Sequence, residues 1–457
     1  MKRISLSRIA LVVALFSLAP AMGSAEAATS LSKTLTVGVD DDASFVVASK
    51  SGWIVGGTTF ESSESSTVFT EKPMGGSDIW VTQLDASLNS LWSHRVGSSK
   101  NDIAGGVTLD VNGNIWIIGT SQLDTSTASP VVMTTLPPPS LGPTTAQGIA
   151  PITVNPDGVS LTSPLVAAPS PLNQLTIQGL RSDGSALLKS SINFGEKYSI
   201  LPTGVVSDVS GLWIAGTILT LESKASRGFY LYCDFALQCK APIFLGKSAT
   251  SIRTLALNSG VILVAGSTND PWKGKPAIGK VDALALVINA KSGAITQTQR
   301  SGNTGTRRSW ESSSIVNGEA VLAGTVDYGK KMEIVTTTFT KVGAVSSTGR
   351  WLGAPRVALA PRGSGALALA FSVSPNELKA ISPTAKGVGL EVAIMSLSAS
   401  KTGKRALKTL YLTPRSGDQE LFALGGDQGA LLAISSSGGG QLLIDRYPDS
   451  GSGAVKR

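Results

Sequence analysis

Short apolar runs, each introduced by a turn glycine, recur along the chain and form its dominant pattern. Seven times a glycine leads into a run such as GWIVGGT, GNIWIIGT or GLWIAGT. β-Branched and aromatic residues are frequent in these runs, and no sustained 3.6-residue apolar period follows residue 30, so the pattern predicts strands. The runs begin at Gly52, Gly113, Gly211, Gly260, Gly318, Gly365 and Gly429.

A second glycine precedes each run at a nearly constant distance, which marks an internal repeat. The paired glycines lie 14, 16, 16, 14, 16, 12 and 12 residues apart. Each unit is predicted to hold four strands, A (innermost) to D, joined by Gly, Asn and Asp turns such as DVNGN and RSDGS. The C strands are expected to begin near Asp78, Gln174, Gly228, Ala283, Met332, Glu391 and Gln441.

Two strands at the ends of the chain have no partner within their own unit. The segment SKTLTVG, Ser32 to Gly38, is a D strand without a C strand before it, and QLLIDRYP, residues 441–448, is a C strand without a D strand after it. A ring in which the first strand completes the last sheet accounts for both and removes exposed sheet edges. The predicted fold is therefore all-β, a seven-bladed β-propeller of four-stranded antiparallel blades.

Three tryptophans occur at one position of the repeat. Trp53, Trp116 and Trp213 each stand three residues before a B-strand glycine and are predicted to pack between adjacent blades. The segment GSDIWVTQLDASLNSLWSHRVGSSKNDIAGGVTLDVNGNIWIIGTS resembles the repeats of bacterial secreted seven-bladed propeller proteins, the SBBP repeats. The resemblance is clear here and weak in the sixth and seventh units. It implies the fold, but these families share no agreed activity, so it implies no catalytic residues.

The stretch APIFLGKS, Ala241 to Ser248, has the spacing of a nucleotide-binding phosphate loop. Such a loop presents backbone N–H groups to phosphate and continues into a helix. Here the spacer is bulky, and the following SATSIRTLAL is strand-like. Gly246 also occupies the same repeat position as Gly97 and Gly195, neither of which belongs to a phosphate-loop sequence. The match is therefore interpreted as a coincidence of the repeat.

Residues 1–27 have the features of a secretory signal peptide. Lys2, Arg3 and Arg8 precede an apolar stretch over residues 9–22, and Ala25-Glu26-Ala27 provides a small-residue cleavage site. That stretch is too short for a comfortable membrane span, and no later segment is long and apolar enough for one. We therefore expect an exported protein, periplasmic or extracellular, whose residues 28–457 form a single propeller domain without a membrane span.

The charge and the cysteines fit this expectation. Without the signal peptide the chain keeps 36 basic and 30 acidic residues, and residues 334–417 hold eleven Lys or Arg but only two Glu. That basic sector is either a solvated face or a surface that favours anionic polymers. Cys233 and Cys239, the only cysteines, bracket a predicted hairpin, so we expect a disulfide between them. We expect a monomer that binds no nucleic acid.

The loops are predicted to differ between the two faces of the ring. In an antiparallel meander, A–B and C–D turns share one face, here called the plain face, whereas B–C and D–A connections share the other, the elaborated face. The longer segments belong to the second set, so function is expected there. The longest, residues 122–171, contains ten of the 22 prolines. We interpret it as an arm, either a binding element or a tolerated insertion, because proline disfavours regular strands; a degenerate eighth blade stays an alternative.

Few residues offer catalytic chemistry. The single histidine, His94, falls on an outer strand, so neither a Ser-His-Asp triad nor a histidine-rich metal site is supported. One candidate consists of Asp40, Asp41 and Asp42, which are expected in a D–A connection near the channel mouth. They would serve as acid and base, as Ca²⁺ ligands, or only as turn residues. Arg307, Arg308 and Trp310 form a second candidate, which would hold an acidic sugar by ion pairing and stacking; the alternative is a loop without a ligand.

Two function classes follow from these observations. The favoured one is a non-enzymatic exported binding module that contacts its ligand with the elaborated face and needs no cofactor. Envelope glycans, other anionic polymers and proteins are its candidate partners. The alternative is an extracellular carbohydrate-active hydrolase or lyase with carboxylates at the channel mouth, and the fold alone does not choose between the two.

Overall fold

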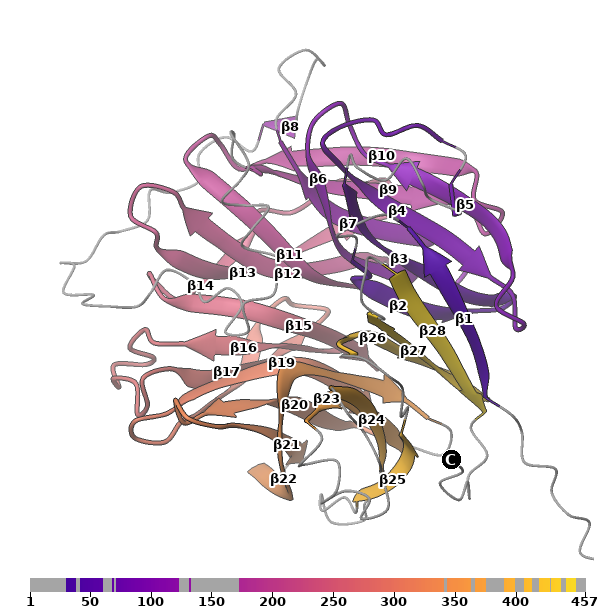
Figure 1. Ribbon diagram of the computed structural model, residues 1–457. Coiled ribbons are helices and arrows are strands. Elements are labelled where there is room, and N and C mark those ends of the chain that lie inside the picture. The colour runs from indigo at the N-terminus through magenta and orange to yellow at the C-terminus, as the bar shows by residue number, and fades with distance from the viewer. Residues whose placement is uncertain are drawn as a thin grey trace, which may run out of the picture.

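The computed structural model shows a closed ring of β-sheets (Figure 1). It describes residues 30–37, 42–60, 68–69, 71–122, 131–132, 172–340, 343–362, 366–374, 390–398, 407–412, 419–427, 429–436 and 441–448. Residues 1–27, which are expected to form a signal peptide, and nearly all of the proline-rich residues 122–171 lie outside these residues.

The first four blades follow the chain in order. Blade 1 contains β2 (Phe45–Ser49), β3 (Gly52–Phe60), β4 (Ser77–Leu84) and β5 (Ser90–Val96). Blade 2 contains β6 (Asp102–Leu109), β7 (Ile115–Ser121), β9 (Gln174–Leu180) and β10 (Ala186–Asn193), with the short β8 (Val131–Val132) parallel to β10. Blade 3 contains β11 (Tyr198–Ser207), β12 (Gly211–Thr220), β13 (Ser226–Asp234) and β14 (Ile243–Leu245). Blade 4 contains β15 (Thr250–Asn258), β16 (Val261–Thr268), β17 (Asp282–Asn289) and β18 (Ile295–Ser301).

The last three blades complete the ring. Blade 5 contains β19 (Arg307–Val316), β20 (Glu319–Asp327), β21 (Met332–Thr340) and the first half of β22 (Gly343–Pro361), whose second half begins blade 6. Blade 6 continues with β23 (Leu367–Val373), β24 (Glu391–Leu397) and β25 (Leu407–Leu412). Blade 7 contains β26 (Leu421–Gly426), β27 (Ala430–Ser436) and β28 (Gln441–Pro448). The predicted seven-bladed propeller is confirmed.

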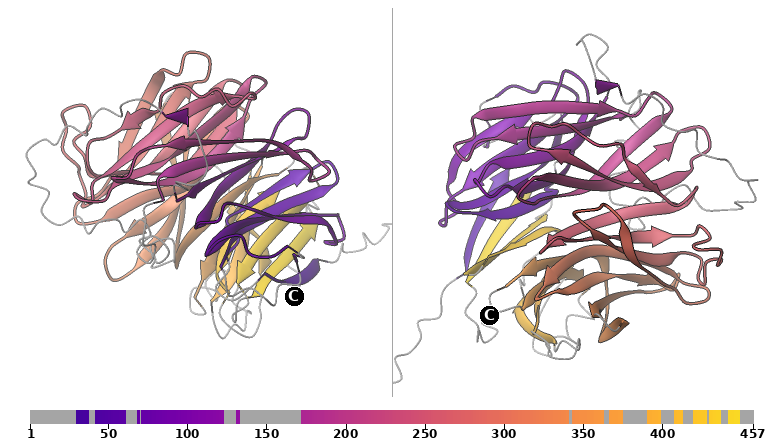
Figure 2. Two further views of the ribbon diagram at one scale, coloured as in Figure 1. Left: turned by 90° about the horizontal axis from the view of Figure 1, so that it is seen from above. Right: turned by 180° about the vertical axis from the view of Figure 1, so that it is seen from behind.

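The predicted closure of the ring is also confirmed. Strand β1 (Leu31–Thr36) pairs antiparallel with β28, from Leu31 opposite Arg446 to Thr36 opposite Gln441. The indigo β1 therefore lies beside the yellow β28 in Figure 1, and the two further views in Figure 2 show the same neighbours. Because the first strand is the outer strand of the last blade, the closure joins the two ends of the chain.

The hydrophobic core lies between neighbouring blades. Trp53 packs with Leu432 and Ile434 of blade 7, and Trp116 packs with blade 3 residues that include Ile214. All three tryptophans of the repeat are buried, with exposed fractions of 2% for Trp53, 1% for Trp116 and 6% for Trp213. Their predicted position between blades is therefore confirmed.

Hydroxyl groups at the ends of B strands link one blade to the next. The backbone N–H of Ala104 donates to Thr58 Oγ1 (3.1 Å), that of Ile252 to Thr217 Oγ1 (2.9 Å), and that of Leu421 to Ser372 Oγ (2.9 Å). Each bond joins a B strand to the inner strand of the following blade. A Thr or Ser near the end of each of these B strands therefore accepts a hydrogen bond from a buried backbone N–H that the hydrogen bonds within the sheet leave unpaired.

The apparent phosphate loop binds an anion of the protein itself. The backbone N–H groups of Lys247, Ser248 and Ala249 donate to the carboxylate of Asp270, with distances of 2.8 Å, 3.1 Å and 3.0 Å. Gly246 has a φ of +73°, and a Cβ there would lie 2.5 Å from Asp270 Oδ2, so only glycine fits. The glycine of this repeat position thus serves a turn that wraps a buried carboxylate.

The predicted disulfide between Cys233 and Cys239 is present, across the hairpin that joins β13 to β14. Within the part of the chain that the structure describes, no helix is long and apolar enough to cross a membrane.

Candidate functional site

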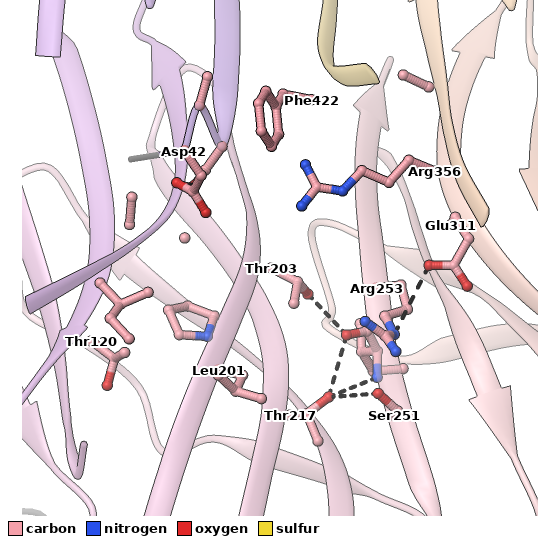
Figure 3. A pocket seen from close by; sticks show the side chains of 18 of the residues that line it. Asp42, Thr120, Leu201, Thr203, Thr217, Ser251, Arg253, Glu311, Arg356 and Phe422 are labelled. Carbon is pink, nitrogen blue, oxygen red and sulfur yellow. Dashed lines mark hydrogen bonds and ion pairs between the residues drawn. The ribbon is translucent and has the colours of Figure 1, made fainter. Parts of the chain in front are cut away.

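A pocket of about 230 Å³ lies at one end of the central channel. All seven blades contribute to it, through residues at or near the beginnings of their inner strands. Since inner strands begin at the D–A connections, the pocket belongs to the elaborated face. Its lining, shown in part in Figure 3, comprises Asp42, Ala43, Ser44, Ile103, Ala104, Gly105, Thr120, Leu201, Pro202, Thr203, Thr217, Ser251, Ile252, Arg253, Glu311, Arg356, Val357, Ala358, Leu421 and Phe422.

β-Bulges place several of these residues in the channel. In five inner strands the register with the B strand shifts by one residue, which leaves one residue of the inner strand without an opposite partner. A bulge re-aims a side chain relative to a regular strand. The five residues all line the pocket; they are Gly105, Thr203, Arg253, Glu311 and Phe422.

Asp42 lies on the blade 1 side of the pocket, just before β2. Its carboxylate accepts hydrogen bonds from the Thr58 backbone N–H (3.0 Å) and the Ser44 hydroxyl (3.1 Å), while its backbone carbonyl accepts one from Trp80 Nε1 (3.0 Å). Burial raises the pKa of Asp42 above its ordinary value, against the lowering effects of the Thr58 N–H, Arg356 and Ser44. Asp42 is therefore a carboxyl group that protonates more readily than an exposed aspartate.

Arg356 enters the pocket from blade 6. Its Nε lies 3.4 Å from Glu420 Oε1, and its guanidinium carbon lies 4.6 Å from the centre of the Phe422 ring. Figure 3 shows the guanidinium extended towards Asp42 across the pocket. Within the described residues no hydrogen bond reaches its Nη atoms. The ion pair and the ring therefore orient this cation while its terminal N–H groups face the pocket.

Arg253 and Glu311 form the third charged group, from blades 4 and 5. Arg253 Nε lies 4.0 Å from Glu311 Oε2, and the two side chains are 13% and 15% exposed. Among the described residues no donor reaches the buried Glu311 Oε1. Beside them the Thr217 hydroxyl contacts Ser251 Oγ at 3.2 Å. Glu311 therefore offers an acceptor oxygen for a donor from a ligand.

These groups define the chemistry that the pocket is able to perform. Arg356 presents N–H donors that suit a carboxylate or sulfate, Glu311 presents an acceptor that suits a hydroxyl, and Phe422 presents an apolar surface. In the part of the chain that the structure describes, no group of three or more His, Cys, Asp or Glu residues is arranged to hold a metal ion. Calcium binding by Asp40, Asp41 and Asp42 stays a prediction, because Asp40 and Asp41 lie outside the described residues.

The two candidate groups that the sequence predicts lie in different places in the structure. Asp42 lies in the pocket, as its predicted place near the channel mouth requires. Arg307 and Arg308 instead begin β19, where Arg307 lies opposite Asp327 of the neighbouring strand β20. Trp310 is 1% exposed and packs in the core, with the Arg308 guanidinium carbon 5.1 Å from its ring centre. Trp310 is therefore a core residue without an exposed ring face for a sugar, while binding by Arg307 and Arg308 stays a prediction.

The comparisons with known proteins concern the fold. No protein-family model and no curated protein matches the sequence, so neither supports the resemblance to the SBBP repeats. Among solved structures, the chain is similar to the Dos1 propeller (8% identity, 93% of this chain and 96% of that chain, TM-score 0.44). It is also similar to a polysaccharide lyase of family PL25, an ulvan lyase (12%, 93% and 98%, TM-score 0.47), and to the Hadza microbial sialidase Hz136 (12%, 90% and 66%, TM-score 0.43). At these values the likenesses carry no information on activity.

Proposed function

We propose that this protein is an exported, non-enzymatic binding module whose channel pocket holds one acidic unit of an anionic glycan. The observation that carries the proposal is Arg356, whose guanidinium is fixed by Glu420 and Phe422 with its Nη atoms turned into the pocket. A planar guanidinium binds carboxylate and sulfate groups in a bidentate manner. A cation held in advance loses less side-chain entropy when it binds.

The other pocket groups suit the neutral part of such a ligand. Sugar hydroxyls donate to carboxylate oxygens, and Glu311 Oε1 supplies one that is buried and without a protein donor among the described residues. A pocket of about 230 Å³ is smaller than the roughly 300–1,000 Å³ common for drug-sized ligands. We therefore expect it to hold a chain end or a single unit, with the rest of the polymer outside.

Export is part of the proposal and is supported by two features. The N-terminal sequence has the organisation of a signal peptide, and the Cys233–Cys239 disulfide fits an oxidising compartment. Mass spectrometry of the protein recovered from an expression host tests this directly. We expect a mature chain that begins after Ala27, outside the cytoplasm.

One observation favours the alternative, a carbohydrate-active hydrolase or lyase. Burial raises the pKa of Asp42, and Glu311 lines the same pocket beside Arg253. Two carboxyl groups in one pocket are the components of acid and base catalysis. In this alternative Asp42 donates the proton and Glu311 accepts one or activates water.

An array of acidic and neutral glycans, probed with the purified protein, separates these functions. We expect selective binding to carboxylated or sulfated glycans, a loss in Arg356→Gln, and unchanged binding in Arg181→Gln, whose arginine lies in an exposed turn on the plain face. Binding that is indifferent to Arg356→Gln would contradict the pocket assignment.

The bound glycans are then incubated with the protein and analysed for shorter products. The binding module predicts intact glycans. Shorter products that disappear in both Asp42→Asn and Glu311→Gln, while binding persists, would establish the enzyme instead.

A further inference from the structure

A groove of about 740 Å³ lies on the plain face, away from the channel pocket. It crosses the seam between blades 3 and 4 and is lined only by turn segments and adjoining strand ends. The segments are the A–B turns after β6, β11 and β15 and the C–D connections after β13 and β17. Because none of these residues lines the channel pocket, the groove is a separate feature of the molecule.

The wall of the groove on blade 3 is held by the disulfide. Tyr232 and Lys240 flank Cys233 and Cys239 in sequence, and the backbone N–H of Lys240 donates to the Tyr232 carbonyl (2.8 Å). The Lys240 ammonium lies 5.1 Å from the centre of the Tyr232 ring, and that ring lies 5.1 Å from Trp213. The disulfide therefore fixes an aromatic ring and a cation side by side.

The charge of the groove favours an acidic partner. Lys240 and Lys291 are exposed on its two sides. Its one carboxylate, Asp208, accepts hydrogen bonds from Ser210 N (2.7 Å), Ser210 Oγ (2.6 Å), Gly211 N (3.0 Å) and Trp213 Nε1 (3.2 Å). These protein donors already occupy Asp208, so the lysines are the charged groups left to meet a ligand.

Aliphatic side chains at the rim distinguish the ligand further. Val209 is 83% exposed and Val111 is 64% exposed, and both occupy the second position of equivalent Asp-Val turns in adjacent blades. Two exposed valines beside one groove leave apolar surface that a partner is able to cover. Aliphatic contacts suit amino-acid side chains better than sugars, which stack on aromatic faces.

We propose that the plain-face groove binds an acidic peptide segment of a partner protein. Its aspartates or glutamates pair with Lys240 and Lys291, and an aliphatic side chain packs against Val209 and the Tyr232 ring. The protein thus has two binding surfaces, one at each end of the ring.

A bead-displayed library of short random peptides, sorted into acidic, neutral and basic sets, tests this proposal. We expect the labelled protein to select acidic peptides that contain aliphatic residues. In Lys240→Glu/Lys291→Glu, the affinity measured by fluorescence anisotropy should fall by about ten-fold or more, because two exposed ion pairs become repulsive. The matched control is Lys224→Glu/Lys273→Glu, two exposed lysines of the same blades in B–C connections of the opposite face, which should retain binding.

Other outcomes would overturn the proposal. One is a library selection that does not favour acidic over basic peptides. A second is equal affinity of the two double variants for the selected peptides. A third is displacement of these peptides from the wild-type protein by dextran sulfate, which would indicate an anionic polymer as the occupant. Arg356→Gln should leave peptide binding unchanged. The groove and the channel pocket can therefore fail or succeed independently.

Discussion

The Asp270 carboxylate is predicted to hold the loop that resembles a phosphate-binding motif, and its removal should destabilise the propeller. Asp270 is 3% exposed and accepts hydrogen bonds from three backbone N–H groups and from the hydroxyls of Ser248 and Thr250. A hydrogen bond to a charged group contributes about 1.5–3 kcal/mol, and an orphaned buried donor costs about 1–3 kcal/mol.

These contributions do not add fully in the Asp270→Ala variant. Lys247 and Ser248 are exposed, so water replaces part of the lost bonding around the loop. Thr250 is fully buried, and its hydroxyl lies 2.7 Å from Asp270 Oδ2. We therefore expect the free energy of unfolding to fall by about 3 kcal/mol in Asp270→Ala and by about 1–2 kcal/mol in Asp270→Asn, which keeps one acceptor oxygen.

Urea unfolding followed by tryptophan fluorescence measures both changes. The control is Asp183→Ala, which removes an aspartate from an exposed turn where it accepts a hydrogen bond from Ser185 N. The control should unfold near the wild-type midpoint. An Asp270→Ala protein with the wild-type midpoint and slope would refute the claim that this carboxylate organises the loop.

Four further predictions concern pH, blade contacts and closure. Burial raises the pKa of Asp102 from 3.8 to about 6, so its contribution to stability is present in full below about pH 4 and is lost as the pH rises through 6. Urea unfolding between these values should show a slope that Asp102→Asn flattens, and an unchanged slope would contradict the assignment. Thr217→Val leaves the Ile252 N–H without its acceptor and should cost about 1–3 kcal/mol in the same assay; no loss would mean that the inter-blade bond is unimportant. Replacing both Cys233 and Cys239 with alanine should cost about 2 kcal/mol, since the disulfide closes a short loop, and unchanged unfolding would refute this. Deleting Leu31–Thr36 exposes the edge of β28 and should promote self-association in size-exclusion chromatography; a stable monomer would contradict the role of the closure.

The blade pattern could be predicted from the sequence because each blade repeats the same structural requirements. Gln174, Met332, Glu391 and Gln441 begin C strands as expected. The unpaired strands at the two ends indicated the closure, because a sheet edge requires a partner. The tryptophans before the B-strand glycines indicated the contacts between blades.

The candidate site was predictable only in part. Asp42 was accessible to sequence reasoning, since it precedes an inner strand at the channel mouth. Arg253, Glu311 and Phe422 were missed, because a β-bulge alters side-chain direction without changing the apolar pattern. Their signal was positional, since each follows the inner-strand residue that lies opposite the seventh position of the repeated B-strand run.

The arginine and tryptophan group shows the converse error. Arg307, Arg308 and Trp310 were expected in a loop, but strand β19 already begins at Arg307. Pairing with β20 directs Trp310 into the core, where it packs with Leu322. The start of this strand was therefore placed too late along the chain.

The most direct test of the account is a calorimetric titration of the wild-type, Arg356→Gln and Arg181→Gln proteins with the acidic glycan that binds best on the array. The account predicts saturable one-to-one binding by the wild type and by Arg181→Gln, and an affinity about ten-fold or more lower in Arg356→Gln, since a charged hydrogen-bonding group is lost. Equal affinities of all three proteins, or no acidic glycan that binds, would contradict the claim that the channel pocket is the binding site.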